Sequence, residues 1–222
     1  VKYVQTEQRG VSHARNIGIS VTQSNWIALL DSDDVWLPHK LETQIKALQQ
    51  AKVLYQICHS DEIWIRNGRR VNPGKRHQKQ GGWIYPDCLP LCAMSPSSIM
   101  IHRDVFGQVG LFDESMAVCE DYDLWLRITA RYPVLYVDQP LIEKYGGHSD
   151  QLSCRYWGMD RFRIRALQKM LQSTSLSSQY RQMTIETLLQ KAAVYLAGAR
   201  KRHKWDEVAY YESLCQFYQS SS

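Results

Sequence analysis

Several features that would define other classes of protein are missing from this sequence of 222 residues. No run of about 18 apolar residues is present, so no segment reads as a membrane span. The N-terminus lacks a basic region followed by an apolar stretch, so no secretory signal is visible. The first residue is Val rather than Met, which suggests a processed or truncated chain and leaves an upstream signal open.

An excess of charge of one sign is also lacking. The 27 Lys and Arg residues against 22 Asp and Glu leave a net charge of +5. This excess fits an anionic small substrate or an acidic membrane surface and is too small to indicate nucleic acid. For the densest basic cluster we weigh a solvated loop against contact with phosphate or lipid headgroups; it comprises Arg69, Arg70, Lys75, Arg76, His77 and Lys79.

Metal-binding cysteine patterns are absent as well. The six cysteines are scattered, at positions 58, 88, 92, 119, 154 and 215. Only Cys88 and Cys92 are close together, and no second pair of Cys or His has zinc-finger spacing. Without a secretory signal, we expect reduced thiols, several of them in the core.

Strand and helix signals alternate over the first two thirds of the chain. Helices are predicted over residues 12–22, 38–50 and 121–131. The pair Asn67-Gly68 predicts a turn, and the stretch that follows it through Gly82 predicts a mobile loop. The run Ile27–Leu30 predicts a strand buried on both faces. Further strands are predicted over residues 2–5, 53–65, 98–102, 134–137 and 141–145.

After Ser153 the signals are helical only, over residues 156–171, 180–200 and 205–218. Strands and helices followed by helices alone predict an α/β domain with a helical appendage. We place the α/β domain at residues 1–153 and the helical C-terminal region at residues 154–222. The helices of this region either pack in the ordinary way or dock a partner or membrane.

Three carboxylates follow the predicted strand that ends at Leu30: Asp31, Asp33 and Asp34. Ligands of open α/β sheets bind beyond the carboxyl ends of strands. A cluster of oxygen ligands suits Mg²⁺ or Mn²⁺, which can also hold a diphosphate. The alternative is an acidic turn and helix cap.

Two further motifs carry polar groups suited to a site. Glu120 and Asp121 begin a predicted helix, where carboxylates commonly serve the helix dipole and where one can also accept a proton from an attacking hydroxyl. His148 follows Gly146-Gly147, and a neutral imidazole there is either a metal ligand or an ordinary loop residue.

As an ordered set these stretches resemble the family 2 glycosyltransferases, over roughly residues 3–153. The resemblance is carried by Gly10–Ile19, Trp26–Trp36, Val109–Glu114, Glu120–Arg127 and the segment from Gly146 to Ser153. It implies a GT-A fold, a Rossmann-like mixed sheet flanked by helices. The strand, helix and strand that usually open this fold are absent from the sequence, which implies an N-terminally truncated domain whose activity alone is open.

The resemblance also implies roles for individual residues. Asp31-Ser32-Asp33 matches the family's D-x-D motif, with Asp31 near the donor ribose and Asp33 on the metal. Asp34 and His148 are further candidate metal ligands. Asp121 is the expected base, with Glu120 as its neighbour. Arg15 and Asn16 match a segment near the nucleotide.

The implied reaction is transfer of one sugar, with inversion, from a nucleotide-diphosphate sugar to a hydroxyl of a glycan, lipid-linked or protein acceptor. Mg²⁺ or Mn²⁺ is the implied cofactor. No Gln-x-x-Arg-Trp segment of processive synthases is present. The implied setting is cell-surface polysaccharide biosynthesis in the cytoplasm, with peripheral contact to the inner membrane as an option. The alternatives are a non-catalytic module that binds sugar nucleotides and a nucleotidyltransferase, although a Gly-rich basic phosphate loop is lacking.

Overall fold

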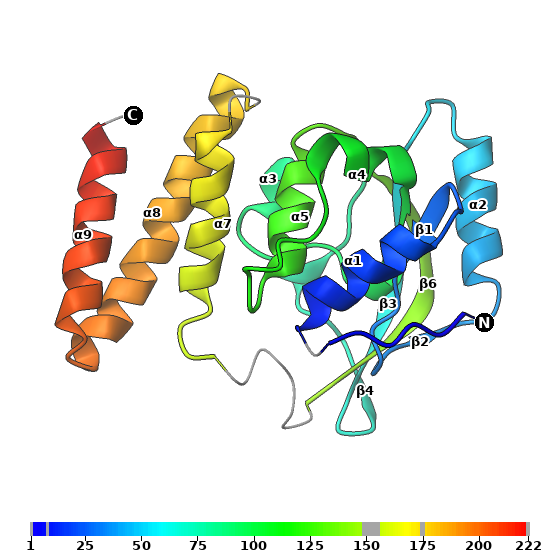
Figure 1. Ribbon diagram of the computed structural model, residues 1–222, viewed down its shortest axis with the longest axis horizontal. Coiled ribbons are helices and arrows are strands. Elements are labelled where there is room, and N and C mark those ends of the chain that lie inside the picture. Colours follow the sequence, from blue (N-terminus) through cyan, green and yellow to red (C-terminus); the bar gives the residue numbers. More distant parts are fainter. Residues whose placement is uncertain (1, 8, 148–155, 174–175, 221–222) are drawn as a thin grey trace.

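The computed structural model describes residues 2–7, 9–147, 156–173 and 176–220. Its centre is a mixed sheet in the order β1-β5-β3-β6-β2, with β4 paired to the outer part of β3. The strands β3 and β6 run parallel, and the other neighbours are antiparallel. Helices flank the sheet, as Figure 1 shows. The predicted GT-A-like mixed sheet is therefore confirmed.

The N-terminal part begins with helix α1 (Val11–Val21) and strand β1 (Trp26–Ala28). The strand predicted over residues 2–5 is wrong, because these residues are exposed and belong to no strand of the described structure. The prediction of full burial at Ile27–Leu30 is also wrong at two positions, Ala28 and Leu30. Ile27 and Leu29 are buried, but Ala28 of the edge strand β1 is half-buried, and Leu30, which lies beyond the end of β1, is 49% exposed.

A hairpin joins β3 (Ile57–Arg66) to β4 (Arg69–Val71). Asn67 and Gly68 have φ of 50° and 71°, as the predicted tight turn requires. The two strands predicted between residues 134 and 145 are one long strand, β6 (Leu135–Gly146), whose pairing with β3 shifts register at Asp61. The short β2 (Val35–Trp36) and β5 (Ile99–His102) complete the sheet.

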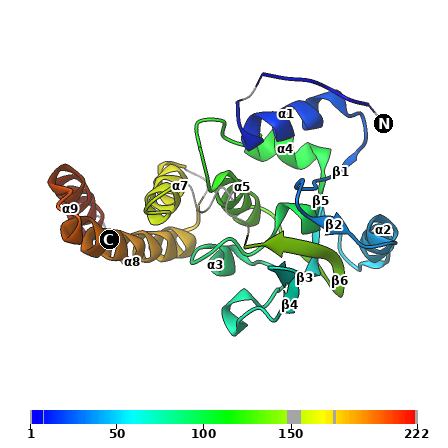
Figure 2. The ribbon, with the colours of Figure 1, turned by 90° about the horizontal axis from the view of Figure 1, so that it is seen from below.

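Helix α2 (Lys40–Gln50) packs beside β3 and β6, and α4 (Arg103–Val109) packs beside β5 and α5. Figure 2 shows α1 and α4 together on one side of the sheet. Helix α5 (Glu120–Thr129) is the central helix of the core, since Trp125, Leu124 and Ile128 are fully buried. The short α3 (Tyr85–Cys88) packs against α5.

The helical C-terminal region comprises α7 (Asp160–Gln172), α8 (Ser178–Lys201) and α9 (Trp205–Ser220), which form a row beyond α5 in Figure 1. Tyr85 of α3 is buried, stacks on Tyr180 and hydrogen-bonds Thr184 of α8 at 2.7 Å. Lys191 of α8 donates to the carbonyl of Pro90. The region is thus joined to the α/β part by specific contacts. Within the described residues no helix is long and apolar enough to cross a membrane.

Candidate active site

Arg15 joins the two acidic motifs that the sequence singles out. From α1 its guanidinium donates to Asp31 Oδ1 at 2.5 Å and to Glu120 Oε1 at 2.7 Å. The Arg15 side chain is 11% exposed, and it lies over the ring of Phe112, 5.1 Å from the ring centroid. Charge-assisted hydrogen bonds made by a largely buried guanidinium are strong and have a defined geometry. The residues after β1 and the start of α5 therefore meet at one place, as the predicted site requires.

The acidic residues after β1 form a turn, in which the Asp34 N–H donates to the Asp31 carbonyl. Asp34 is buried, and its two oxygens accept hydrogen bonds from Ser97 Oγ at 2.6 Å and from the Tyr145 N–H at 3.0 Å. Burial raises the pKa of Asp34 against these hydrogen bonds. Asp31 is partly exposed, and Asp33 is exposed at the tip of the turn. The three carboxylates thus differ in access, and Asp33 is the most open to solvent.

Asp121 is held in place by two donors. Its Oδ1 accepts from the Tyr122 N–H at 2.7 Å, and its Oδ2 accepts from the Cys92 thiol at 3.0 Å. With Glu120 and Cys92 it lines a cavity of about 210 Å³. Each carboxylate oxygen retains a lone pair beyond the bond it accepts. Asp121 can therefore accept a proton from a group that enters this cavity.

Glu120 has an unusual environment for a carboxyl group. It is 7% exposed. Burial and the neighbouring Asp121 raise its pKa to about 7, although Arg15 opposes the shift. A carboxyl held near neutrality by its surroundings is typical of functional sites, and also of structural ion-pair networks.

Lys144 of β6 supplies a second cation behind this centre. Its ammonium donates to Ser95 Oγ at 2.8 Å. Burial lowers the pKa of Lys144, but Glu62, Cys92, Asp34 and Asp121 together raise it above the ordinary value. The group is therefore charged and contributes positive potential between the acidic turn and Asp121.

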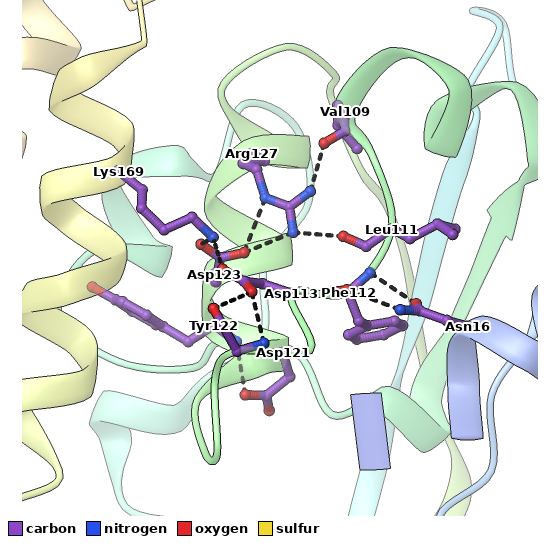
Figure 3. Close-up of polar contacts among 11 residues, drawn as sticks. Asn16, Val109, Leu111, Phe112, Asp113, Asp121, Tyr122, Asp123, Arg127 and Lys169 are labelled. Atoms are coloured by element: carbon purple, nitrogen blue, oxygen red, sulfur yellow. Dashed lines mark hydrogen bonds and ion pairs between the residues drawn. The ribbon is translucent and has the colours of Figure 1, made fainter. Parts of the chain in front are cut away.

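A second polar network fixes the loop before α5 and accounts for the other polar residues of the motifs (Figure 3). Asn16, 8% exposed, donates to the Phe112 carbonyl and accepts from its N–H. Arg127 donates to the carbonyls of Val109 and Leu111 and to Asp123. Lys169 of α7 pairs with Asp123 and Asp113, at 2.6 Å each. Asn16 thus positions a loop, and its predicted nucleotide contact stays a prediction.

The structure describes only some of the predicted metal ligands. His148 lies outside the described residues. Among those described, no cluster of three or more His, Cys, Asp or Glu could hold a metal ion. Both oxygens of Asp34 already accept hydrogen bonds. The metal-ligand roles of Asp33, Asp34 and His148 stay predictions.

Three residues of the site could not be identified from the sequence: Cys92, Ser97 and Lys144. Each lies far along the chain from the acidic residue that it contacts or faces, and none belongs to a recognisable motif. The one available signal was the position of Ser97 just before a predicted strand. The five described cysteines, at positions 58, 88, 92, 119 and 215, are free thiols, as expected.

Comparison with protein families gives two matches. The model described as Glycosyl transferase family 2 matches residues 1–106, and the model described as Glycosyltransferase like family 2 matches residues 82–194. Together they extend over the α/β part and into α8.

Curated relatives include an uncharacterized glycosyltransferase of Rickettsia conorii, 27% identical over 164 residues, which are 68% of this chain and 26% of the relative. The UDP-Glc:alpha-D-GlcNAc-diphosphoundecaprenol beta-1,3-glucosyltransferase WfgD of Escherichia coli is 29% identical over 125 residues, which are 54% of this chain and 44% of that protein. The chain thus spans between a quarter and a half of the length of these relatives.

Solved structures with a similar fold include S. aureus TarS 1–349, with a TM-score of 0.59 and 11% identity over 99% of this chain and 74% of that one. Another is the mannosyltransferase PcManGT from Pyrobaculum calidifontis in complex with GDP-Man and Mn²⁺, with a TM-score of 0.54 and 13% identity over 97% of this chain and 65% of that one. At this identity the likeness concerns the fold alone.

Proposed function

Since the chain belongs to the family 2 glycosyltransferases, we propose that it serves the transfer of a single sugar, with inversion, from a nucleotide-diphosphate sugar to an acceptor hydroxyl. The observation that carries this proposal is the Arg15 bridge between Asp31 and Glu120. It holds the turn assigned to the donor beside the helix end assigned to the acceptor. Neighbours of the same fold bind UDP or GDP-Man, which supports a nucleotide-sugar donor.

Asp121 is the proposed base. The acceptor hydroxyl enters the cavity beside Asp121, and its proton passes to a carboxylate oxygen as the hydroxyl oxygen attacks the anomeric carbon. The Cys92 thiol and the Tyr122 N–H fix the rotamer of the carboxylate. Such positioned general bases contribute about 10²- to 10⁴-fold to rate. Attack opposite the leaving diphosphate inverts the configuration.

The acidic residues suit a hard divalent cation. Four carboxylates, Asp31, Asp34, Glu120 and Asp121, interact with Arg15 or Lys144. The exposed Asp33 lies in the same turn as Asp31 and Asp34. Oxygen ligands and an excess of negative charge fit Mg²⁺ or Mn²⁺. Asp33 would hold the ion together with the Asp31 oxygen that Arg15 does not bind. When bound, the cation would stabilise the charge on the leaving diphosphate.

The test combines a screen of nucleotide sugars with two substitutions. Metal-dependent thermal stabilisation identifies the donor, and release of nucleoside diphosphate in the presence of acceptor measures turnover. Asp121→Asn should retain donor binding and lose turnover, because an amide cannot accept the proton. Asp33→Ala should lose metal-dependent turnover. The exposed Asp104→Asn on α4 is the control.

Two outcomes would contradict this assignment. If Asp121→Asn abolished donor binding too, Asp121 would be a donor-contact or structural residue. If donor bound but no transfer occurred with any acceptor tested, the chain would be the non-catalytic sugar-nucleotide module that the sequence leaves as an alternative.

A further inference from the structure

A second, larger cavity lies next to the proposed base. Its volume is about 380 Å³. Residues 75–80 form one wall, and the turn that follows α3, including Pro90 and Cys92, forms another. Glu62, Trp64 and Lys144 of the parallel strands β3 and β6 complete it. Four members of the basic cluster that the sequence singles out thus line this cavity, namely Lys75, Arg76, His77 and Lys79, whereas Arg69 and Arg70 do not.

Cys92 connects this cavity to the proposed site. It lines both the larger cavity and the smaller one that contains Asp121. Its thiol donates to Asp121 Oδ2 at 3.0 Å. The two cavities therefore share Cys92 as a lining residue, and a molecule whose hydroxyl meets Asp121 would have to extend past this thiol to reach the larger cavity. The turn Asp31–Asp34, to which the donor diphosphate is assigned, does not line that cavity.

The charge of the larger cavity is positive. Four cations line it, Lys75, Arg76, Lys79 and Lys144, against the two carboxylates of Glu62 and Asp87. Lys79 pairs with Glu62 at 3.3 Å. Burial would raise the pKa of Glu62, but Lys79 and Lys144 lower it to about 2. The carboxylate therefore stays ionised and offsets only part of the positive charge.

Lys75 and Arg76 are the cations available to a ligand. Both are exposed, and across the described ranges neither has a carboxylate within ion-pair distance. Arg76 Nε instead contacts His77 Nε2 at 3.0 Å. Burial lowers the pKa of His77, and Arg76, Lys79 and Lys144 lower it further. The low pKa of His77 thus reflects the positive potential of the cavity, and a bound anion should raise this pKa.

The wall that carries these cations is anchored. Lys79 donates to the Ala93 carbonyl at 3.0 Å, and the buried His59 contacts the Gln80 carbonyl at 2.7 Å. The ring of His77 lies 5.0 Å from that of Trp64. At Gly81 a Cβ would lie 3.0 Å from Tyr136 and the Val134 carbonyl, so the chain approaches β6 closely. The loop predicted to be mobile thus makes specific contacts at His77 and at residues 79–81, and it contains a short helical turn at Lys75–His77.

We propose that this cavity binds a phosphate or diphosphate group of the acceptor, with Lys75 and Arg76 as its principal contacts. The inference rests on the proposed function, because it places the acceptor hydroxyl at Asp121. Lys and Arg side chains that line a cavity and have no carboxylate partner among the described residues favour phosphate oxygens, which accept several charge-assisted hydrogen bonds. Two sources share this chemistry: a lipid-linked sugar diphosphate and a water-soluble sugar phosphate.

The test uses inorganic pyrophosphate in the presence of EDTA, so that no metal supports binding at the acidic turn. Calorimetry measures affinity at low and high salt, and NMR follows the His77 imidazole. The double variant Lys75→Gln/Arg76→Gln removes the two cations. The control Arg69→Gln/Arg70→Gln removes the same charge from exposed residues of the neighbouring β4, which do not line the cavity.

We expect pyrophosphate to bind the wild-type protein, to raise the pKa of His77 and to bind at least tenfold more weakly to the first double variant. The control should change affinity less than twofold. Equal losses in both double variants, no loss in either, or an unmoved His77 would overturn the proposal. Displacement of pyrophosphate by UDP without metal would also overturn it, because the cavity would then belong to the donor.

Two further measurements separate the remaining questions. Farnesyl diphosphate in phosphatidylcholine vesicles, with farnesol as the neutral control, represents a lipid-borne acceptor. If farnesyl diphosphate binds more tightly than free pyrophosphate, the acceptor is lipid-borne. If the two bind equally, the acceptor is a water-soluble sugar phosphate. Stabilisation by UDP with Mn²⁺ is measured in parallel. If pyrophosphate binds as expected but no nucleotide sugar is bound or turned over, the proposed function fails while the anion site stands.

Discussion

Replacing Arg15 by Met should make the stability of the protein more sensitive to pH. Arg15 is the cation that contacts both Asp31 and Glu120, and it opposes the effect of burial on Glu120. Methionine keeps much of the packing over Phe112 and removes the charge. Glu120 should then stay protonated at a pH where it ionises in the wild-type protein.

The size of the effect follows from proton linkage. A carboxyl whose pKa is raised by folding stabilises the fold at low pH, and that contribution is lost as pH rises toward the folded pKa. With a pKa of about 7, the ionisation of Glu120 should lower the stability of the wild-type protein by about 1 kcal/mol between pH 6 and pH 8. In Arg15→Met the carboxyl stays protonated over both pH units, so the loss of stability over this interval becomes about twice as large.

Urea unfolding at pH 6 and pH 8, in EDTA, measures the two differences. Between pH 6 and pH 8 we expect the free energy of unfolding of Arg15→Met to fall by about 1 kcal/mol more than that of the wild-type protein. The variant should also be less stable than the wild-type protein by a constant amount at both pH values. Glu120→Gln in the Arg15→Met background should remove the extra slope. An equal pH dependence of wild type and Arg15→Met would refute the electrostatic role assigned to Arg15.

Three other substitutions test the surrounding framework. Asn16→Ala should lower the free energy of unfolding by about 2–4 kcal/mol, because it leaves the backbone N–H and carbonyl of Phe112 unpaired; a loss below 1 kcal/mol would contradict it. Asp123→Asn should cost about 1–3 kcal/mol in the same assay, because the buried carboxylate that pairs with Arg127 and Lys169 becomes neutral. Burial lowers the pKa of Lys40 to about 8. The free energy of unfolding of the wild-type protein should therefore rise by up to about 3 kcal/mol as pH rises from 8 to 10.5. Lys40→Met should abolish this rise, whereas the control Lys46→Met, on the exposed face of α2, should not.

The elements that sequence patterns identify well are those with a local cause. Helices α1, α2, α5, α8 and α9 follow apolar spacing and end close to their predicted boundaries. The turn at Asn67-Gly68 follows from residues that tolerate positive φ. The mixed sheet follows from the order of the elements and from the family resemblance.

The elements that sequence patterns miss depend on tertiary contacts. Strand β2 has two residues and exists because Val35 and Trp36 pair with β6. Helix α3 is a single turn beneath α8. One continuous β6 replaces two predicted strands because β3 absorbs the irregularity at Asp61 through a register shift. None of these partners can be recognised locally.

The candidate site divides in the same way. Asp31, Glu120 and Arg15 could be named from motif spacing, and the structure brings them together. The burial of Asp34 by Ser97 and Tyr145, and the contact of Cys92 with Asp121, arise from strands and loops distant along the chain. The roles of these residues toward donor, acceptor and metal stay predictions.

The contacts that α8 makes with α3 have a consequence for how this protein can diversify. Tyr85 meets Tyr180 and Thr184, and Lys191 holds the Pro90 carbonyl, so a helix about 100 positions downstream supports the outer wall of the basic hollow. Replacements along that helix can tilt or loosen the wall without altering any group that touches a substrate. Substitutions in the helical C-terminal region can therefore change the selectivity for the acceptor while Asp31, Glu120 and Asp121 stay unchanged.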